Sequence, residues 1–474
     1  LYIVIEALYW FKMKLKIYNS KSKSKENFNP INKNEIKMYV CGPTVYDRAH
    51  IGNARPVIVF DLLYRLLRLI YKDKSITYVR NITDVDDKII NRSINENKPV
   101  NEITSETIRW FNEDNDYLNV LKPTHEPKAT EYISQMISMI DKLVSKNNAY
   151  VLDDGEVLFS VNSFDNYGSL SRQNLNSMNV GNRVDIDKRK KNPLDFVLWK
   201  PADKNNIGWN SPWGYGRPGW HIECSAMCKE LLGESFDIHG GGIDLLFPHH
   251  ENELAQSICA NDTKQLANYW VHNGFVNIEG QKMSKSLGNY LTVEDLRKKD
   301  IYGAVIRFVL LSTHYRQPLD WTNRKVSEAQ NILTKWLSLF EKKDVPIHGK
   351  PTKKILEALC DDLNSPLVLT EIHNLLKIED FNGFINSLVF LGFIPNELNK
   401  KSNIKNKFDG NNIHELINDL ILARQTARDN KDYRKSDEIR NRLEKAGVSI
   451  NDLGENTKWT LKPFFNPKKL LEEN

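Results

Sequence analysis

The sequence predicts an α/β protein whose first part is built on a parallel sheet and whose last part is helical. Two apolar runs, residues 37–40 and residues 75–79, have the length of strands, and the first is followed by a Gly-Pro turn. Strands that end in this way are typical of a parallel sheet, where ligands gather beyond the carboxyl ends. Between these two runs, residues 54–71 form an apolar stretch that is interrupted by basic residues. This pattern predicts a helix. From residue 326 onward the apolar residues recur at helical spacing instead.

Composition and charge are ordinary for a soluble protein. The 474 residues are enough for about three domains. The 66 Lys and Arg residues against 61 Asp and Glu residues give a formal charge of +5, which permits nucleic-acid binding through local patches without demonstrating it. Five scattered cysteines are too few for a disulfide scaffold, so a reducing compartment is expected. Since no stretch has the ~20 apolar residues needed to cross a bilayer, we expect a cytoplasmic protein without a membrane partner.

The first twelve residues differ from the rest of the chain. Residues 1–12 are apolar and aromatic, begin without methionine and precede Met13. They also lack a basic leader before their apolar part. We therefore expect residues 1–12 to be a non-native or disordered extension, with Met13 as the natural start.

Three consecutive glycines mark a candidate ligand surface within residues 236–253. Their bare backbone lets a flat ligand such as a nucleoside approach closely. Hydrogen-bonding side chains flank the glycines, and Pro248 downstream suits the first position of a helix. The three glycines are Gly240, Gly241 and Gly242, and the flanking residues are Asp237, His239 and Asp244. A glycine-rich turn followed by an amphipathic helix is the alternative reading.

Four residues form a candidate metal site. His249 and Glu253 are four apart, so on a helix they share one face and can reach one ion. Cys41 and Cys224 add soft ligands from two other segments, and such a mixed set suits zinc better than calcium or magnesium. Cys228 lies four residues after Cys224 and could compete, but a small buried apolar role explains it more simply.

Two further segments carry phosphate-binding chemistry. In His50-Ile-Gly52-Asn53, the glycine allows close approach, while two polar side chains and a helix N-terminus supply donors. A histidine that merely caps the helix is the alternative. In residues 280–289, Lys282 and Lys285 stand with two serines between glycines, and such a loop can close over a triphosphate and neutralise departing pyrophosphate. The segment is not a Walker-type loop.

The last part of the chain combines packing helices with a basic, aromatic surface. The apolar stripe of the first long helix predicts packing against a core, and it consists of Ala329, Ile332, Leu333, Trp336, Leu337 and Phe340. After a polar linker, two shorter helices are expected, the second ended by Gly447. Their cations and aromatic residues are typical of single-stranded RNA recognition, although a solvated basic helix is equally consistent. These residues are Arg424, Arg428, Arg434, Lys435, Arg440, Arg442, Tyr433 and Trp459.

Five motifs, taken in order and spacing, closely resemble those of the cysteinyl-tRNA synthetases, a family of class I aminoacyl-tRNA synthetases. They are Cys-Gly-Pro-Thr-Val-Tyr-Asp (41–47), His-Ile-Gly-Asn (50–53), Gly-Trp-His-Ile-Glu-Cys-Ser (219–225), the glycine stretch with His-His-Glu-Asn-Glu (236–253) and Lys-Met-Ser-Lys-Ser (282–286). The resemblance covers nearly everything from Met13 to Trp459. It implies ATP-dependent ligation of L-cysteine to tRNA(Cys) through a cysteinyl-adenylate, with release of pyrophosphate and AMP.

The resemblance also implies cofactors and site residues. One zinc ion per chain would be held by Cys41, Cys224, His249 and Glu253. The thiolate of the substrate would bind this ion, which disfavours serine and removes the need for an editing domain. ATP, used with Mg²⁺, would be bound by His50, Gly52, Asn53, Gly241 and Lys285. The catalytic set would be His50, Asn53, Lys282 and Lys285.

The remaining implied residues bind the amino acid and the tRNA. Cysteine would be held by Thr44, Thr83, Trp220 and Asp244. The anticodon would be read by Arg428, Tyr433, Asp437 and Asp452, with the aromatic ring stacked on a base and the carboxylates accepting hydrogen bonds from base amino groups. One departure stands out. Asn53 replaces the usual second histidine of the first signature, and it can donate a hydrogen bond but cannot carry a charge.

The implied architecture is a Rossmann-like parallel-sheet catalytic domain with an inserted domain, a helical bundle and a small anticodon-binding domain, in a monomer. The expected boundaries are 13–115 and 215–270 for the two catalytic halves, 116–214 for the insertion, 271–325 for the stem-contact region with the Lys-Met-Ser-Lys-Ser loop, 326–400 for the bundle and 410–474 for the anticodon-binding domain.

Two rival functions are considered. A ligase of the same fold could transfer cysteine to a small amine, but such enzymes lack an anticodon domain, and the segment after residue 412 argues against this. A binding-only relative could hold tRNA without catalysis. The presence of all four zinc ligands and both loop lysines argues against that reading.

Overall fold

The computed structural model describes residues 14–72, 74–172, 187–283, 287–342, 345–394, 410–453, 456–461 and residue 470. The chain divides into two compact units. The first comprises Leu1–Lys299, Leu310–Trp321 and Lys353–Glu371, and the second comprises Asp300–Val309, Thr322–Thr352 and Ile372–Asn474. The extension expected at residues 1–12 lies outside the described residues. The domain boundaries expected from the sequence stay predictions.

The centre of the first unit is a four-stranded parallel sheet, as predicted. Its strand order is β11-β10-β3-β4. The strands are β3 (Glu35–Val40), β4 (Ser75–Arg80), β10 (Phe236–Gly242) and β11 (Ala267–Asn273). The predicted runs at 37–40 and 75–79 are therefore confirmed as β3 and β4. The three glycines, expected in a turn or a bare surface, are the last residues of the buried strand β10.

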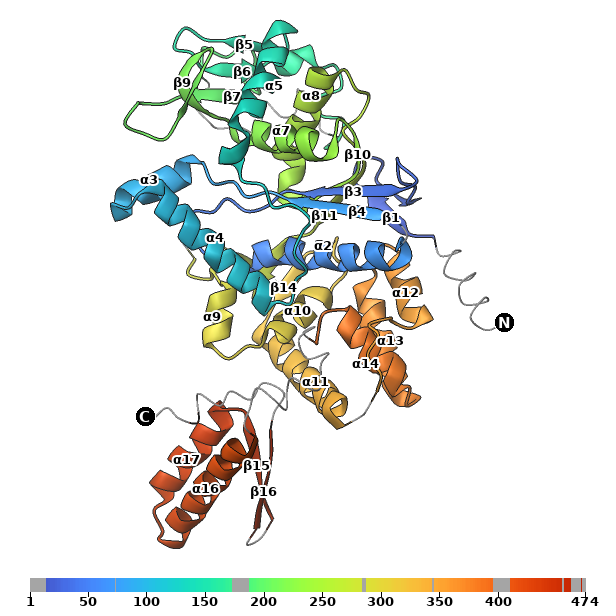
Figure 1. The fold of residues 1–474 in the computed structure, drawn as a ribbon, viewed down its shortest axis with the longest axis vertical. Helices are drawn as coiled ribbons and strands as arrows, with labels where there is room; N and C mark the ends of the chain where they lie inside the picture. The colour runs from blue at the N-terminus through green and yellow to red at the C-terminus, as the bar shows by residue number, and fades with distance from the viewer. Residues whose placement is uncertain are drawn as a thin grey trace. The chain divides into compact units, whose positions relative to one another are not determined.

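Helices cover both faces of this sheet (Figure 1). Helix α2 (Ile51–Ile70), which confirms the helix predicted between the first two strands, contacts β4, β10 and β11. On the opposite face lie α7 (Trp220–Leu232) and α8 (Glu251–Asn261). Gly240 explains how α2 packs so closely, because a Cβ atom there would lie 2.2 Å from the ring of Phe60.

A second sheet lies between β4 and α7 in sequence. It has five strands in the order β5-β6-β7-β9-β8, all paired antiparallel. Its strands are β5 (Ala149–Val151), β6 (Val157–Phe159), β7 (Phe196–Pro201), β8 (Trp209–Ser211) and β9 (Gly214–Pro218), and the preceding helices are α3 (Asp87–Glu96), α4 (Val100–Tyr117) and α5 (Ile133–Ser145). Buried side chains of α5, β6, β7, α7 and α8 form one continuous core.

Smaller elements complete the first unit. A hairpin begins it, and a three-stranded sheet follows β11. These elements are β1 (Lys16–Asn19), β2 (Ser24–Asn27), β12 (Val276–Ile278), β13 (Gln281–Lys282), β14 (Leu319–Trp321), α9 (Val293–Lys298) and α12 (Lys353–Cys360). Two helices, α10 (Gly303–Leu311) and α13 (Ser365–Lys377), have residues in both units.

The second unit is mainly helical, as predicted. In α11 (Asn323–Lys342), Trp336 is buried and lies 5.7 Å from the ring of Phe308 and 5.9 Å from that of Phe384, which belongs to α14 (Phe381–Phe390). The C-terminal part consists of α16 (Gly410–Asp429), α17 (Tyr433–Lys445) and an antiparallel pair, β15 (Val448–Leu453) with β16 (Asn456–Leu461). Gly447, expected to end the second helix, follows α17 with a φ of +83°.

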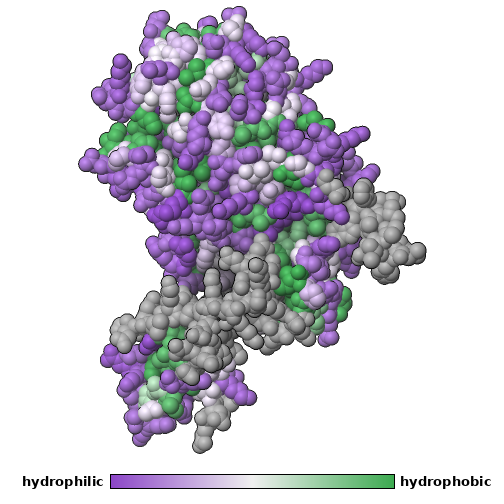
Figure 2. Space-filling view, in the orientation of Figure 1, coloured by the Kyte–Doolittle hydropathy of each residue, from purple (hydrophilic) through white to green (hydrophobic). Residues whose placement is uncertain are grey.

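Figure 2 shows one face of the molecule, and hydrophilic residues predominate over its coloured part. Across the residues described above, none of the helices combines the length and the apolar character that a membrane span requires.

Candidate active site and metal cluster

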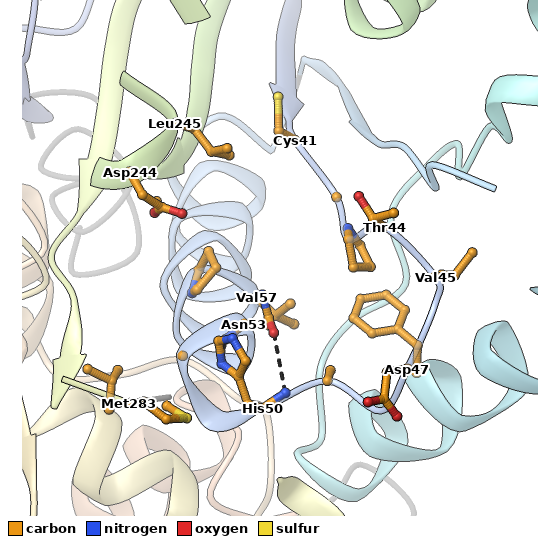
Figure 3. Close-up of a pocket in the computed structure, with 18 of the residues that line it drawn as sticks. Cys41, Thr44, Val45, Asp47, His50, Asn53, Val57, Asp244, Leu245 and Met283 are labelled. Carbon is orange, nitrogen blue, oxygen red and sulfur yellow. Dashed lines mark hydrogen bonds between the residues drawn. The ribbon is translucent and has the colours of Figure 1, made fainter. Parts of the chain in front are cut away.

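A pocket of about 430 Å³ lies beyond the carboxyl ends of β3 and β10 (Figure 3). The loop after β3, the N-terminus of α2 and the loop after β10 form its walls. Eight of the residues assigned from the sequence to catalysis, substrate binding or metal binding line it, namely Cys41, Thr44, His50, Gly52, Asn53, Trp220, Asp244 and Lys282. The parallel-sheet edge where ligands were expected is therefore the edge that is hollowed.

Three residues predicted to bind ATP or cysteine are not among those that line the pocket. Thr83 is buried, and its hydroxyl donates a hydrogen bond to Glu223 Oε2 at 2.9 Å. Gly241 does not border the pocket, whereas the adjacent Gly242 does. Lys285 lies outside the described residues.

His50 and Asn53 form a reciprocal cap at the start of α2. The backbone N–H of Asn53 donates to His50 Nδ1, and the backbone N–H of His50 donates to Asn53 Oδ1, both at 3.3 Å. This is the capping role considered from the sequence, and it coexists with a place in the pocket wall. A neutral imidazole that accepts at Nδ1 carries its hydrogen on Nε2. Because the first turn of α2 has no acidic residue, the helix N-terminus also keeps its positive potential for an anion.

The four predicted metal ligands come together. Their donor atoms all lie within 4.8 Å of one another, although they are drawn from β3, α7 and the residues around the start of α8. Cys41 Sγ is 3.8 Å from Cys224 Sγ and 3.4 Å from Glu253 Oε1. His249 Nε2 is 3.6 Å from Cys224 Sγ and 3.0 Å from Glu253 Oε1. A tetrahedral site with ligand bonds of ~2.0–2.3 Å places neighbouring donors ~3.3–3.8 Å apart, so this set fits a zinc-sized ion.

The local structure around His249 differs from the prediction. Pro248 was expected at the first position of a helix, but it follows a cis peptide bond within a π-helical turn, Leu246–His250. Helix α8 begins only at Glu251. The turn nevertheless brings His249 and Glu253 within 3.0 Å, so the expected contact forms with different backbone geometry.

Burial and mutual contacts set the charges in this cluster. The hydrogen bond from Cys41 lowers the pKa of Cys224 to about 6, whereas burial raises the pKa of Cys41 well above its usual value. Burial opposes the charged form of His249, but Glu253 and Cys224 outweigh it and raise its pKa to about 10. Burial likewise opposes the charge on Glu253, but His239 and His249 overcome it and hold the pKa of this carboxyl well below its usual range. The cluster thus favours one thiolate and one carboxylate, the forms that bind metal, whereas His249 must give up its proton before it can act as a ligand.

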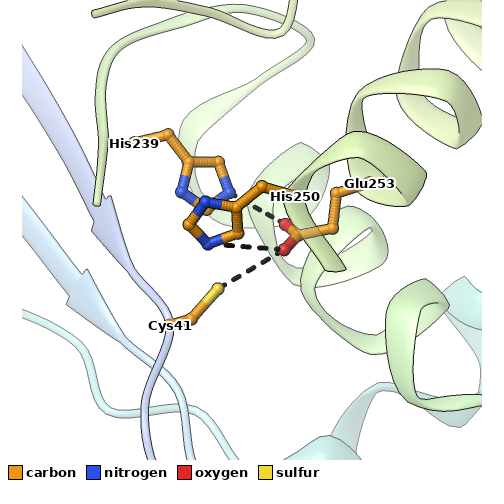
Figure 4. Close-up of side chains that lie close together, drawn as sticks. All are labelled: Cys41, His239, His250 and Glu253. Atoms are coloured by element: carbon orange, nitrogen blue, oxygen red, sulfur yellow. Dashed lines mark hydrogen bonds and ion pairs between the residues drawn. The ribbon is translucent and has the colours of Figure 1, made fainter. Parts of the chain in front are cut away.

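Neighbouring histidines support the ligands. His239 Nε2 lies 2.8 Å from Glu253 Oε2, and His221 Nδ1 lies 2.8 Å from His249 Nδ1. His239, His250, Cys41 and Glu253 form a second group of close donors that shares two members with the first (Figure 4). From the sequence, His239 was placed only beside the glycines. The supporting role of His221 was missed, although its place three residues before Cys224 on one helix was a usable signal.

Cys228 is buried and belongs to neither donor group, as expected for a packing residue. Trp220 links the cluster to the pocket, because its ring stacks on His249 with centroids 4.2 Å apart and also lines the cavity. Cys41 likewise belongs to both. The metal cluster therefore borders the pocket through Cys41.

The residues expected to read an anticodon lie on α16, α17 and β15. Tyr433 is 64% exposed, and Asp437 is exposed as well. Asp452 is already engaged by cations, since Arg424 donates to both of its carboxylate oxygens at 2.9 and 2.8 Å and Arg428 donates at 3.1 Å. A base that hydrogen-bonds to Asp452 would have to compete with these arginines.

Comparisons with known proteins agree with this geometry. The family described as the tRNA synthetases class I (C) catalytic domain matches residues 27–331, and the cysteinyl-tRNA ligase anticodon binding domain matches residues 411–459. The chain is 50% identical to the cysteine–tRNA ligase of Ruegeria sp. (strain TM1040) over 92% of this chain and 94% of the relative. It is 47% identical to that of Cereibacter sphaeroides (strain ATCC 17029 / ATH 2.4.9) over 97% and 99%.

A likeness among solved structures concerns the fold alone. The methionyl-tRNA synthetase of Mycobacterium tuberculosis in complex with methionyl-adenylate has a TM-score of 0.54 with 12% identity, covering 76% of this chain and 89% of that one. The two family matches and the near full-length relatives carry the assignment. The chain belongs to the cysteinyl-tRNA synthetase family of class I aminoacyl-tRNA synthetases.

Proposed function

We propose that the chain ligates L-cysteine to tRNA(Cys), using ATP and a cysteinyl-adenylate intermediate. The observation that carries this proposal is a buried cluster of two thiols, an imidazole and a carboxylate, which borders the pocket at the sheet edge through Cys41. In the first step, the cysteine carboxylate attacks the α-phosphate of ATP and pyrophosphate leaves. In the second, a hydroxyl of the terminal ribose of tRNA attacks the acyl carbon and AMP leaves.

The amino-acid end of the pocket is assigned to the metal cluster. Cys41, Cys224, His249 and Glu253 would hold one zinc ion per chain, and their donor types and spacing fit it. When bound, the ion would supply a Lewis acid suited to the thiolate of cysteine, for which a serine hydroxyl would be a poor substitute. Trp220 packs over His249 and covers this end of the pocket.

Other contacts to the cysteine substrate are assigned to residues that line the pocket. Thr44 and Asp244 face the pocket. Asp244, an acceptor, is assigned to the cysteine ammonium group, and the Thr44 hydroxyl, which can donate, to the carboxylate group. Thr83 is buried and acts through Glu223, so a positioning role suits it better than direct contact.

The nucleotide end is assigned to the start of α2. His50, Gly52 and Asn53 surround the helix N-terminus, where backbone N–H groups and side-chain donors bind phosphate, with Mg²⁺ as the usual counter-ion of ATP. Lys282 lines the pocket, and Lys285 belongs to the same loop in sequence. These lysines would neutralise the charge that develops as pyrophosphate leaves. Among the glycines, Gly242 is a better candidate for nucleotide contact than Gly241, because only Gly242 borders the pocket.

The C-terminal part is assigned to the anticodon of tRNA(Cys). Exposed Tyr433 offers a ring for stacking on a base. Charged groups on the same part of the chain are offered by Arg428, Asp437 and Asp452. The match of residues 411–459 to an anticodon binding domain disfavours a ligase that acts on a small amine. A binding-only relative is disfavoured by the intact pocket and by the catalytic names of the curated relatives. The monomeric state and the cytoplasmic location stay predictions.

One experiment separates these readings. Cysteine-dependent ATP–pyrophosphate exchange is measured first, followed by aminoacylation of tRNA(Cys) transcripts with the native or an altered anticodon. We expect ATP–pyrophosphate exchange with cysteine but not with serine. We also expect aminoacylation of the tRNA to fall when its anticodon is changed. Exchange without charging of any tRNA would favour a small-amine ligase, and tRNA binding without exchange would favour a binding-only protein.

A further inference from the structure

Arg55 is a buried cation held entirely by backbone carbonyl groups. Its side chain is 0% exposed. Nη1 donates to the carbonyls of Gly274 and Phe275 at 2.8 and 2.7 Å, and Nη2 donates to those of His314 and Gln317 at 3.3 and 2.7 Å. Within the described part of the chain, no carboxylate forms an ion pair with it. Burial lowers the pKa of Arg55 to about 10, so the guanidinium remains charged at neutral pH.

These contacts join two walls of the pocket. Arg55 lies in the first turns of α2, two residues after Asn53 and on the same helix as the proposed phosphate-binding segment. Its partners Gly274 and Phe275 follow β11, and both line the same pocket as that helix start. A single side chain therefore spans from the helix that carries one wall to the loop that forms another.

The loop that Arg55 holds has little freedom to adjust. Gly274 donates its N–H to the carbonyl of Tyr315 at 2.8 Å, and a Cβ atom at position 274 would lie 2.7 Å from the carbonyl oxygen of Gln317. Leu319 donates in turn to the carbonyl of Phe275 at 2.9 Å. Several carbonyl dipoles thus converge on one point, and they repel one another unless a cation lies between them.

The four backbone carbonyls around the Arg55 side chain require a guanidinium group. A planar group with five donors can serve carbonyls on two loops at once, whereas an ammonium is a point charge with three donors on a flexible stem. Without it, the carbonyls of His314 and Gln317 would turn away or take up water, and the wall at Gly274 and Phe275 would move with them.

We propose that Arg55 is a positioning residue for ATP, which holds the wall formed by Asn273, Gly274 and Phe275 at a fixed distance from the start of α2. The inference rests on the proposed function, in which ATP lies between these two walls. Arg55 touches no substrate in this account and acts only through the loop carbonyls. Its loss weakens binding of ATP selectively, while the metal cluster and the cysteine end of the pocket keep their geometry.

The test compares Arg55→Lys with a matched variant, Arg65→Lys. Arg65 lies ten residues further along α2, is also buried, and contacts Asp61 Oδ2 and the carbonyl of Asn119 without lining the pocket. ATP affinity is measured by titration calorimetry on the full zinc-loaded chain, alongside KM for ATP and for cysteine in pyrophosphate exchange. We expect Arg55→Lys to raise Kd and KM for ATP at least tenfold and to leave KM for cysteine and the zinc content within twofold. Arg65→Lys should lower thermal stability but leave ATP affinity within twofold.

Three results would overturn the proposal: unchanged ATP affinity in Arg55→Lys, an equal loss of affinity for ATP and cysteine, or the same ATP defect in Arg65→Lys. If Arg55→Lys does not fold, Gly274→Ala replaces it, because its added Cβ pushes the same loop while Arg55 is intact, and the same selective ATP defect is expected. Calorimetry with ATP alone keeps this test separate from the proposed function. A chain that binds ATP normally but fails to activate cysteine contradicts the proposed function and leaves the role of Arg55 open to measurement.

Discussion

The metal cluster and the C-terminal part each place a carboxylate beside basic side chains, but one carboxylate is buried and the other is partly exposed. Glu253 is fully buried and is contacted by His239 and His249. The Asp452 side chain is about one-third exposed and is contacted by Arg424 and Arg428. A buried charge must be met by protein groups, because no water can replace them, whereas an exposed one can exchange partners at little cost. The fold therefore fixes the partners of Glu253 and allows Asp452 to exchange its partners more easily.

This difference predicts how each region responds to change. Removing one member of the buried cluster leaves the others as uncompensated charges and destroys the site. Changing an exposed residue in the C-terminal part alters recognition and leaves the fold nearly intact. The largest effect is therefore expected in the metal cluster and the smallest in the C-terminal part.

Cys224→Ala should abolish the metal site, while Cys228→Ala should preserve it. Both residues are buried on α7, but only Cys224 belongs to the donor cluster. Changes that merely disturb the support of a ligand cost about 10–100-fold in metal affinity or activity, so loss of a ligand should cost more than about 100-fold. Elemental analysis and cysteine-dependent pyrophosphate exchange measure the two outcomes. Equal zinc content in the two variants would mean that the cluster is not the metal site.

The donor set itself could be recognised in the sequence. Two cysteines, a histidine and a glutamate supply ligand types that suit zinc, and the spacing of His249 and Glu253 survived even though the helix starts three residues later than predicted. Ligand chemistry depends on residue type, which the sequence shows directly. The parallel sheet and α2 were predicted for a similar reason, since apolar periodicity within one element is visible in the chain.

Contacts between distant segments could not be predicted in this way. The pairing of Arg424 with Asp452 joins residues 28 apart in sequence, and Arg55 meets carbonyls more than 200 residues away. No periodic pattern and no characteristic spacing in the sequence signals either contact. The support of Glu253 by His239 likewise depends on how β10 lies against α8. Such contacts form only when distant segments pack together in the complete fold. No short stretch of the sequence therefore reveals them.

Tyr433→Ala should weaken tRNA binding with little change in stability. Stacking of a base on an aromatic ring is worth about 1–3 kcal/mol, which corresponds to a loss of affinity of about 5–150-fold. Because the ring is 64% exposed, the free energy of unfolding should change by less than about 0.5 kcal/mol. Tyr433→Phe keeps the ring and should retain the affinity, as measured by filter binding of tRNA(Cys) transcripts. Equal losses in both variants would assign the role to the hydroxyl group and contradict stacking.

Asp452→Asn should cause the smallest effect, a modest loss of stability that depends on pH. The hydrogen bonds from Arg424 and Thr457 hold the pKa of Asp452 well below its usual range. A depressed pKa stabilises the folded state above the unfolded value, about pH 4, and this contribution is lost as pH falls further. Since Asp452 is one-third exposed and screened, we expect a loss of about 1 kcal/mol at pH 7.

The way in which this stability difference changes with pH tests whether Asp452 behaves as an exposed carboxylate, unlike the buried Glu253. Thermal unfolding of the wild-type chain and Asp452→Asn should differ most near pH 7, and the difference should shrink as pH falls below about 4, because the wild-type carboxylate then takes up a proton as well. A difference that stayed constant with pH would show that the introduced amide disturbs packing instead of charge. A loss of several kcal/mol would show that the pair with Arg424 behaves like a buried one, and the C-terminal carboxylate would then be as firmly fixed as Glu253.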